Sequence, residues 1–149
     1  MQALNHVAFG TLLAVTLKQP ALVVPIALAS HFAMDVLPHY GEDSKAPRGS
    51  APYHFRILID GLASLIFVGV FSSRFPEYSG VIMLGALFAV FPDFFWPLAL
   101  YIKQSNPIWK FLRFHKQIQK FESPKGIYNE VVWFIATLLI ISAVRLNSS

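Results

Sequence analysis

The decapeptide SHFAMDVLPH, residues 30–39, places two histidines and an aspartate in an otherwise apolar stretch. His31 and Asp35 are four residues apart, so a helix would stack their side chains on one face, with Cβ atoms about 6 Å apart. Imidazole nitrogens and carboxylate oxygens are ligands of zinc and of manganese or iron ions. Pro38 disfavours a helical residue before it, so the helix should end there. We therefore expect His39 in an exit turn, folding back toward His31 and Asp35.

Other ionisable residues also occur at the ends of apolar runs, or within them. They are His6, Asp60, Asp93 and Glu130. An ionisable side chain inside a bilayer is costly, which makes each of them a candidate functional residue. All of them are expected toward the same end of a helical bundle. Two interpretations follow: the residues bind a metal, or they form a hydrogen-bonded polar cluster without one.

The composition favours a membrane protein. Of 149 residues, 55% are hydrophobic and only 13% are charged, whereas soluble domains have about 25% charged residues. This length suits a single domain, residues 1–149. The chain has no cysteine, so disulfides and thiolate metal ligands are excluded. Any metal must be bound by His, Asp or Glu.

Five apolar runs predict an all-α, polytopic membrane bundle of about five transmembrane helices. The runs are Ala3 to Leu17, Ala21 to Leu37, Ile57 to Phe71, Gly80 to Ile102 and Ile127 to Leu146. Prolines within two of them are compatible with membrane helices, where neighbouring helices satisfy the freed carbonyls. Several runs are shorter than the roughly 20 residues that span a bilayer. A first helical hairpin that is only partly inserted into the membrane is therefore an alternative to two full spans.

The segment IWKFLRFHKQIQKF, residues 108–121, predicts a basic amphipathic helix at the membrane interface. Cations occupy one face of the helical wheel: Lys110, Arg113, Lys116 and Lys120. Apolar residues occupy the other, and His115 falls among them. His115 should therefore point toward the bundle, either as a packed residue or as a ligand.

Lysine and arginine are distributed unequally between the two sides of a five-span topology. Nine lie on the side of the N-terminus: Lys45, Arg48, Arg56, Lys103, Lys110, Arg113, Lys116, Lys120 and Lys125. Three lie on the other side: Lys18, Arg74 and Arg145. The richer side should be cytoplasmic, which predicts a multi-pass protein of the plasma (inner) membrane with a cytoplasmic N-terminus. The expected partners are membrane lipids with anionic headgroups, and no nucleic-acid motif is present.

A weak internal similarity appears when the chain is shifted by 54 residues. His6 then aligns with Asp60, and the Pro38–His39 pair aligns with Pro92–Asp93. One interpretation is a duplicated helical hairpin, residues 1–54 and 55–108, followed by the interfacial helix 107–121 and a last transmembrane helix 127–146. Low identity leaves this duplication as a hypothesis.

Three motifs resemble a known family. ALNHVAFG at the N-terminus, SHFAMDVLPH and VFPDFF are similar to blocks of the small multi-pass membrane-bound metal-dependent hydrolases. More remotely, the Asn5–His6 pair and the spacing of residues 31–39 resemble zinc-dependent phospholipase C and the P1-type nucleases.

This resemblance implies a divalent metal, with zinc favoured and manganese or iron as alternatives. The implied ligands are His6, His31, Asp35, His39, Asp60, Asp93 and His115. Such an ion polarises a phosphoryl oxygen and activates water, which is the chemistry of phosphoester hydrolysis. The implied activity is that of a metal-dependent hydrolase at the cytoplasmic leaflet. Its implied substrate is a phosphoester, and a lipid-linked phosphoester is one candidate. No catalytic acid or base is assigned.

Two other classes of function remain open from the residues. The same histidines and aspartates could form a proton or cation relay in a small transporter. Alternatively, they could form a polar or metal-bound structural core in a membrane protein whose role is interaction.

Overall fold

The structure, a computed structural model, describes residues 1–41, 50–97 and 101–146. Within these residues the α-helices are α1 (Ala3–Leu17), α2 (Pro20–Asp35), α3 (Ala51–Arg74), α4 (Ser79–Val90), α5 (Ile108–Ile118) and α6 (Ile127–Leu146). The short elements are the 3-10 turns η1 (Pro76–Tyr78), η2 (Phe91–Phe95) and η4 (Pro124–Gly126) and the strands β1 (His39–Tyr40) and β2 (Glu122–Ser123). The all-α prediction is confirmed.

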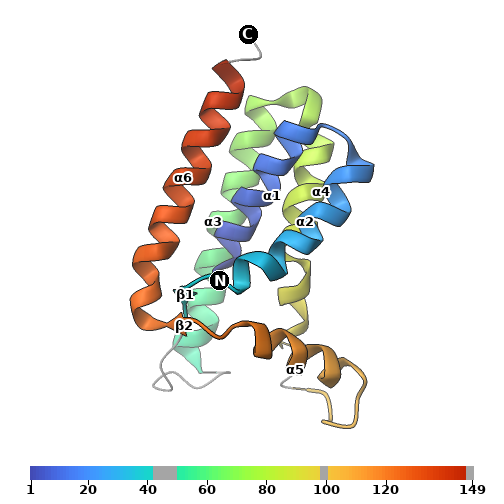
Figure 1. The fold of residues 1–149 in the computed structure, drawn as a ribbon, viewed down its shortest axis with the longest axis vertical. Helices are drawn as coiled ribbons and strands as arrows, with labels where there is room; N and C mark the ends of the chain where they lie inside the picture. Colours follow the sequence, from blue (N-terminus) through green and yellow to red (C-terminus); the bar gives the residue numbers. More distant parts are fainter. Residues whose placement is uncertain (42–49, 98–100, 147–149) are drawn as a thin grey trace.

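Five of the helices lie side by side in an up-and-down bundle. Figure 1 shows α1, α2, α3, α4 and α6 running along the long axis, whereas α5 lies across one end. We call this the α5 end; β1 and β2 also lie there. The turns that join α1 to α2 and α3 to α4 lie at the opposite end.

Two helices match the sequence-based prediction at both ends, and the others differ at one end or both. Helices α1 and α6 have the predicted bounds. Helix α2 ends at Asp35 instead of Leu37, α5 ends at Ile118 instead of residue 121, and α3 extends to Arg74 instead of Phe71. Helix α3 begins earlier than predicted, because the Ser50 side chain accepts a hydrogen bond from the Tyr53 backbone N–H and caps the first turn.

The prediction for the fourth run was wrong at its carboxyl end. Instead of continuing to Ile102, α4 ends at Val90 and the tighter turn η2 follows. Pro92 lacks a backbone N–H and cannot continue the α-helical ladder. Residues 98–100 lie outside the described residues, and 101–107 contain only turns and bends.

Three helical stretches in the described part of the chain are long and apolar enough to cross a membrane. They are Ala51–Arg74, Pro76–Phe95 and Pro124–Val144. Helices α1 and α2 are apolar but shorter. Many large apolar side chains of α3 and α6 are exposed, including Leu65 and Leu139. These faces suit contact with lipid.

Helices α1 and α4 pack closely where two glycines meet. A Cβ at Gly10 would lie 2.2 Å from the Gly85 carbonyl oxygen, and one at Gly85 would lie 2.4 Å from the Gly10 oxygen. Small residues allow such close backbone approach in membrane bundles. This contact fixes the position of α1 relative to α4 and, through them, of His6 relative to Ala89.

The α5 end is held by pairing between segments distant in sequence. Strand β1 pairs with β2 in parallel, with His39 opposite Glu122. Gly126 packs so closely that a Cβ there would lie 2.0 Å from the His39 carbonyl oxygen. The exit from α2 and the chain that follows α5 are therefore joined, which holds α5 near the end of α2.

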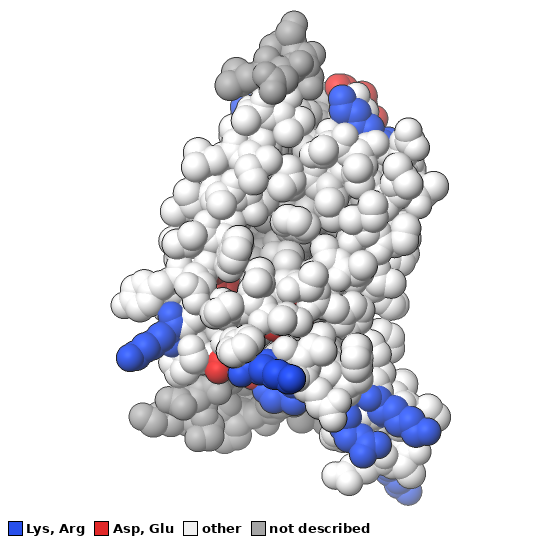
Figure 2. Space-filling model, viewed as in Figure 1, with Lys and Arg blue, Asp and Glu red and all other residues white. Residues whose placement is uncertain are grey.

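Helix α5 has the amphipathic character that the sequence predicts. Leu112 and His115 are buried against the bundle, whereas Lys110, Arg113 and Lys116 are exposed. Figure 2 shows Lys and Arg gathered around the α5 end, with an uncharged surface along most of the bundle.

Candidate metal centre

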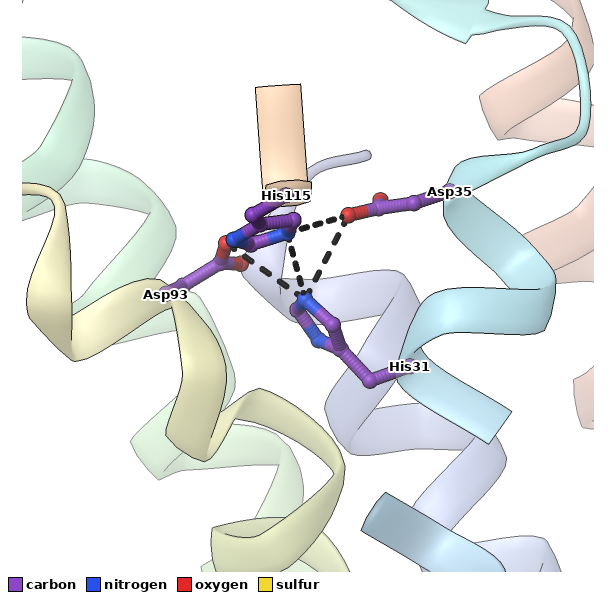
Figure 3. Close-up of side chains that lie close together, drawn as sticks. All are labelled: His31, Asp35, Asp93 and His115. Atoms are coloured by element: carbon purple, nitrogen blue, oxygen red, sulfur yellow. Dashed lines mark hydrogen bonds and ion pairs between the residues drawn. The ribbon is translucent and has the colours of Figure 1, made fainter. Parts of the chain in front are cut away.

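Four side chains from three elements converge near the α5 end. Helix α2 supplies His31 and Asp35, η2 supplies Asp93 and α5 supplies His115. Each offers one ligand atom, and these four atoms lie within 4.8 Å of one another. Figure 3 shows the four side chains pointing toward a common centre. We call them the His–Asp cluster.

The distances within the His–Asp cluster suit a small divalent ion. His115 Nε2 lies 2.7 Å from Asp35 Oδ2, and His31 Nε2 lies 3.3 Å from the same oxygen. The two Nε2 atoms are 3.0 Å apart. Asp93 Oδ1 is 3.7 Å from His31 Nε2 and 3.9 Å from His115 Nε2. A tetrahedral zinc site holds its ligand atoms about 3.3–3.6 Å apart, so small adjustments would accommodate an ion.

The orientation of His31 is fixed by a backbone carbonyl. Its Nδ1–H donates to the Ala89 carbonyl oxygen at 2.8 Å. In the neutral imidazole this leaves Nε2 with a lone pair directed into the His–Asp cluster. Metal-binding histidines typically donate their second ring N–H to a carbonyl or carboxylate in this way. His31 is therefore oriented as a metal ligand would be.

Aromatic packing holds His115 in place. The rings of Trp96 and Phe111 lie 5.3 Å and 5.8 Å from its imidazole, centroid to centroid. Its buried Nδ1 has no hydrogen-bond partner among the described residues. Only Nε2 of His115 therefore engages polar groups, and it points into the His–Asp cluster.

Burial differs across the cluster. The side chains of His31, Asp35 and His115 are fully buried, whereas that of Asp93 is 22% exposed. Solvent or a substrate would therefore approach from the side of Asp93.

His6 borders the His–Asp cluster but is not one of its four members. Its ring stacks on His31 with centroids 4.2 Å apart, and its Nε2 lies 3.2 Å from Asp35 Oδ1. The ammonium group of Met1 lies 2.8 Å from the same oxygen. The two oxygens of Asp35 therefore face different groups: Oδ2 faces His31 and His115, and Oδ1 faces His6.

His39 does not fold back into the cluster, contrary to the sequence-based expectation. It lies in β1, where its Nδ1–H donates to the Leu37 carbonyl oxygen at 2.7 Å. Strand pairing directs the chain away from α2 at this point. Burial lowers the pKa of His39 below its ordinary value, which favours the neutral ring.

Asp60 and Glu130 have other partners. Asp60 accepts hydrogen bonds from the backbone N–H groups of Ala3 and Leu4, at 2.7 Å and 3.0 Å. It thus caps the start of α1 from the neighbouring α3. Glu130 accepts from the Asn5 side chain and from backbone N–H groups of residues 2 and 40. Both carboxylates join chain segments together, and neither belongs to the cluster.

Gln119 contributes to the site but was not a sequence-based candidate. Its side-chain amide donates to Asp35 Oδ2 at 3.1 Å. The available signal was its position four residues after His115, which places both on one face of a helix.

No protein-family model, curated protein or solved structure matches the chain. The resemblance to membrane-bound metal-dependent hydrolases therefore stays a prediction.

Proposed function

We propose that the protein is a membrane-embedded, metal-dependent hydrolase of phosphoesters. The observation that supports this most is the convergence of four imidazole and carboxylate ligand atoms, with the His31 ring oriented by the Ala89 carbonyl. The donor set of two nitrogens and two oxygens suits zinc, with manganese and iron as alternatives.

The buried residues would hold the ion and shield it from bulk water. His31, Asp35 and His115 supply ligand atoms from fully buried side chains. Asp93 is at the exposed side, where it could complete the ligand set or accept a proton from an attacking water. A divalent ion bound there would polarise a phosphoryl oxygen and acidify a water molecule.

The membrane setting favours a lipid-linked or otherwise anionic substrate. We propose that five helices cross the bilayer, with α1 and α2 as short spans, and that α5 lies at the cytoplasmic interface. Its exposed cations, Lys110, Arg113 and Lys116, would attract anionic headgroups toward the open side of the cluster.

The test compares two aspartates of this chain that have different roles. Asp35→Asn removes a charged ligand of the cluster, whereas Asp60→Asn alters the cap of α1. Both purified variants would be assayed for metal content and for hydrolysis of p-nitrophenyl phosphate and bis(p-nitrophenyl) phosphate.

We expect Asp35→Asn to lose metal and activity together, while Asp60→Asn keeps both. Wild-type protein that binds zinc or manganese stoichiometrically but cleaves neither these esters nor phosphatidic acid would contradict the proposed hydrolase.

A proton or cation relay is the second candidate. It is favoured by a continuous series of contacts: His31 lies 3.0 Å from His115, and His115 lies 2.7 Å from Asp35. Chains of histidine and acidic residues carry protons in membrane transporters. Wild-type protein without metal that moves protons across liposome membranes would favour this relay over the hydrolase.

A further inference from the structure

A large apolar cavity lies between α1, α3 and α4. Its volume is about 700 Å³, within the range of ligand-binding pockets, and its lining is almost wholly apolar. Helix α3 contributes Leu58, Gly61 and Leu65, and α4 contributes Met83 and Leu87. Such a lining offers water almost no hydrogen-bond partner, so an apolar occupant is favoured.

The cavity and the His–Asp cluster share the same stretches of backbone. In three pairs of consecutive residues, the first contacts His31 or Asp35 and the second lines the cavity. The pairs are His6–Val7, Ala89–Val90 and Asp93–Phe94. An occupant of the cavity near Phe94 would therefore end beside Asp93, the exposed member of the cluster.

The cavity borders helices that are apolar enough for a membrane. Its α3 and α4 walls belong to Ala51–Arg74 and Pro76–Phe95. Several lining side chains are themselves exposed, with Leu58 at 56% and Leu65 at 71%. From Met83 to Val90 the wall extends about 10 Å at the α-helical rise, and η2 continues it by roughly 8 Å to Phe94. An elongated apolar chain could therefore enter sideways from lipid and lie along the helices.

We propose that this cavity holds a long alkyl chain of the phosphoester on which the His–Asp cluster acts. The substrate class is then an anionic phospholipid, with its chain between α1, α3 and α4 and its phosphate beside Asp93. This inference rests on the proposed hydrolase function. A membrane helix of a second copy is the competing occupant, but it would give no role to the backbone that the cavity shares with the His–Asp cluster.

Two glycines of α3 provide a matched pair of variants. Gly61 lines the cavity, and a Cβ there meets no atom within 4 Å. Gly69 lies two turns further along, is exposed, and also has open space around a Cβ. Gly61→Phe should fill the cavity without disturbing the fold, whereas Gly69→Phe should leave the cavity open.

The probe is phosphatidic acid with a diazirine in its acyl chain, as a minor component of phosphatidylcholine nanodiscs. Metal-free protein is illuminated and the labelled residues are identified by mass spectrometry. We expect labelling at cavity residues that an excess of ordinary phosphatidic acid suppresses. It should be largely lost in Gly61→Phe and kept in Gly69→Phe.

Labelling spread evenly over α3 and α6, insensitive to competitor and to Gly61→Phe, would overturn the inference. So would protein crosslinks between copies at the cavity in place of lipid labelling. Size-exclusion chromatography and circular dichroism would show whether each variant is folded.

The proposed function and the chain site can fail separately. Hydrolysis of dibutyryl and dipalmitoyl phosphatidic acid with the same KM, unchanged in Gly61→Phe, would reject the chain site and keep the hydrolase. Specific labelling of the cavity in a protein without metal binding or hydrolysis would reject the hydrolase and keep a lipid-chain site. If both hold, Gly61→Phe should raise KM for the dipalmitoyl lipid only.

Discussion

Asp35 has the most polar contacts of the residues described around the site. Its Oδ2 accepts hydrogen bonds from His115 and from Gln119, at 2.7 Å and 3.1 Å. Its Oδ1 lies 3.2 Å from His6 Nε2. A buried carboxylate is tolerated only when its oxygens have such partners. The groups around Asp35 therefore determine where its ligand oxygen points.

Gln119→Ala should weaken metal binding about 10- to 100-fold, because residues that orient a ligand affect affinity to this extent. The matched control is Gln117→Ala, an exposed residue in the last turn of α5, which should bind metal as the wild type does. Competition with a chromophoric chelator measures both affinities. Equal affinities in the two variants would show that Gln119 does not orient the ligand.

Asp60→Ala should lower the free energy of unfolding by about 1–2 kcal/mol, the range for losing a helix cap. The residue before α1, Gln2, provides no side-chain cap, so the N–H groups of Ala3 and Leu4 depend on Asp60. Denaturant titration in detergent would measure the loss. The metal content should not change. Loss of metal in this variant would show instead that Asp60 is a metal ligand.

Residue type predicted which positions matter better than it predicted their partners. Buried His and Asp in apolar runs are costly, and His31, Asp35, Asp93 and His115 do lie together. Asp60 and His39 have the same residue types and burial-prone positions, yet each binds a backbone group instead. Local spacing could not reveal the partners of Asp60, since they are 57 and 56 residues away.

At the scale of elements, the contact between α1 and α4 positions the site. Gly10 and Gly85 let the two backbones meet. Gly10 lies four residues after His6 on α1, and Gly85 lies four residues before Ala89 on α4. His6 and the Ala89 carbonyl both contact the His31–Asp35 face of α2. A change at the glycine contact should therefore alter the cluster.

Gly85→Ala should destabilise the protein by about 1–3 kcal/mol, as expected for overpacking. Its Cβ would lie 2.4 Å from the Gly10 carbonyl oxygen. Gly80→Ala, in the same helix with open space around a Cβ, should not destabilise it. Thermal unfolding in detergent checks both variants, and equal midpoints would refute the close packing of α1 on α4.

The apolar runs predicted that the five bundle helices exist, but they did not predict how α4 ends. Pro92 lies within one continuous apolar run, and hydropathy cannot distinguish a kinked membrane helix from a change to the η2 turn. The turn matters because it carries Asp93. The pairing of β1 with β2 was equally hidden, because two-residue strands leave no sequence pattern.

At the scale of the whole molecule, the basic residues of α5 lie at the same end as the His–Asp cluster. Lys45 and Arg48, which also contribute to the predicted charge asymmetry, lie outside the described residues. We expect the α5 end to face the cytoplasm because loops rich in Lys and Arg are retained there.

Reporter fusions would test this orientation. A reporter inserted near Ser50 should report a cytoplasmic location. A reporter fused after Arg145 should report an extracytoplasmic location. Alkaline phosphatase and green fluorescent protein report the two compartments. The reverse pattern would place the cluster and the basic helix at the outer leaflet.

The metal content of purified wild-type protein tests the central claim most directly. After exposure to zinc and manganese and removal of free ions, elemental analysis should find a stoichiometric divalent metal, which His31→Ala should lose. This loss is expected because His31 contributes a buried ligand atom aligned by the Ala89 carbonyl. Wild-type protein that is folded yet metal-free under these conditions would contradict the metal centre and the hydrolase built on it.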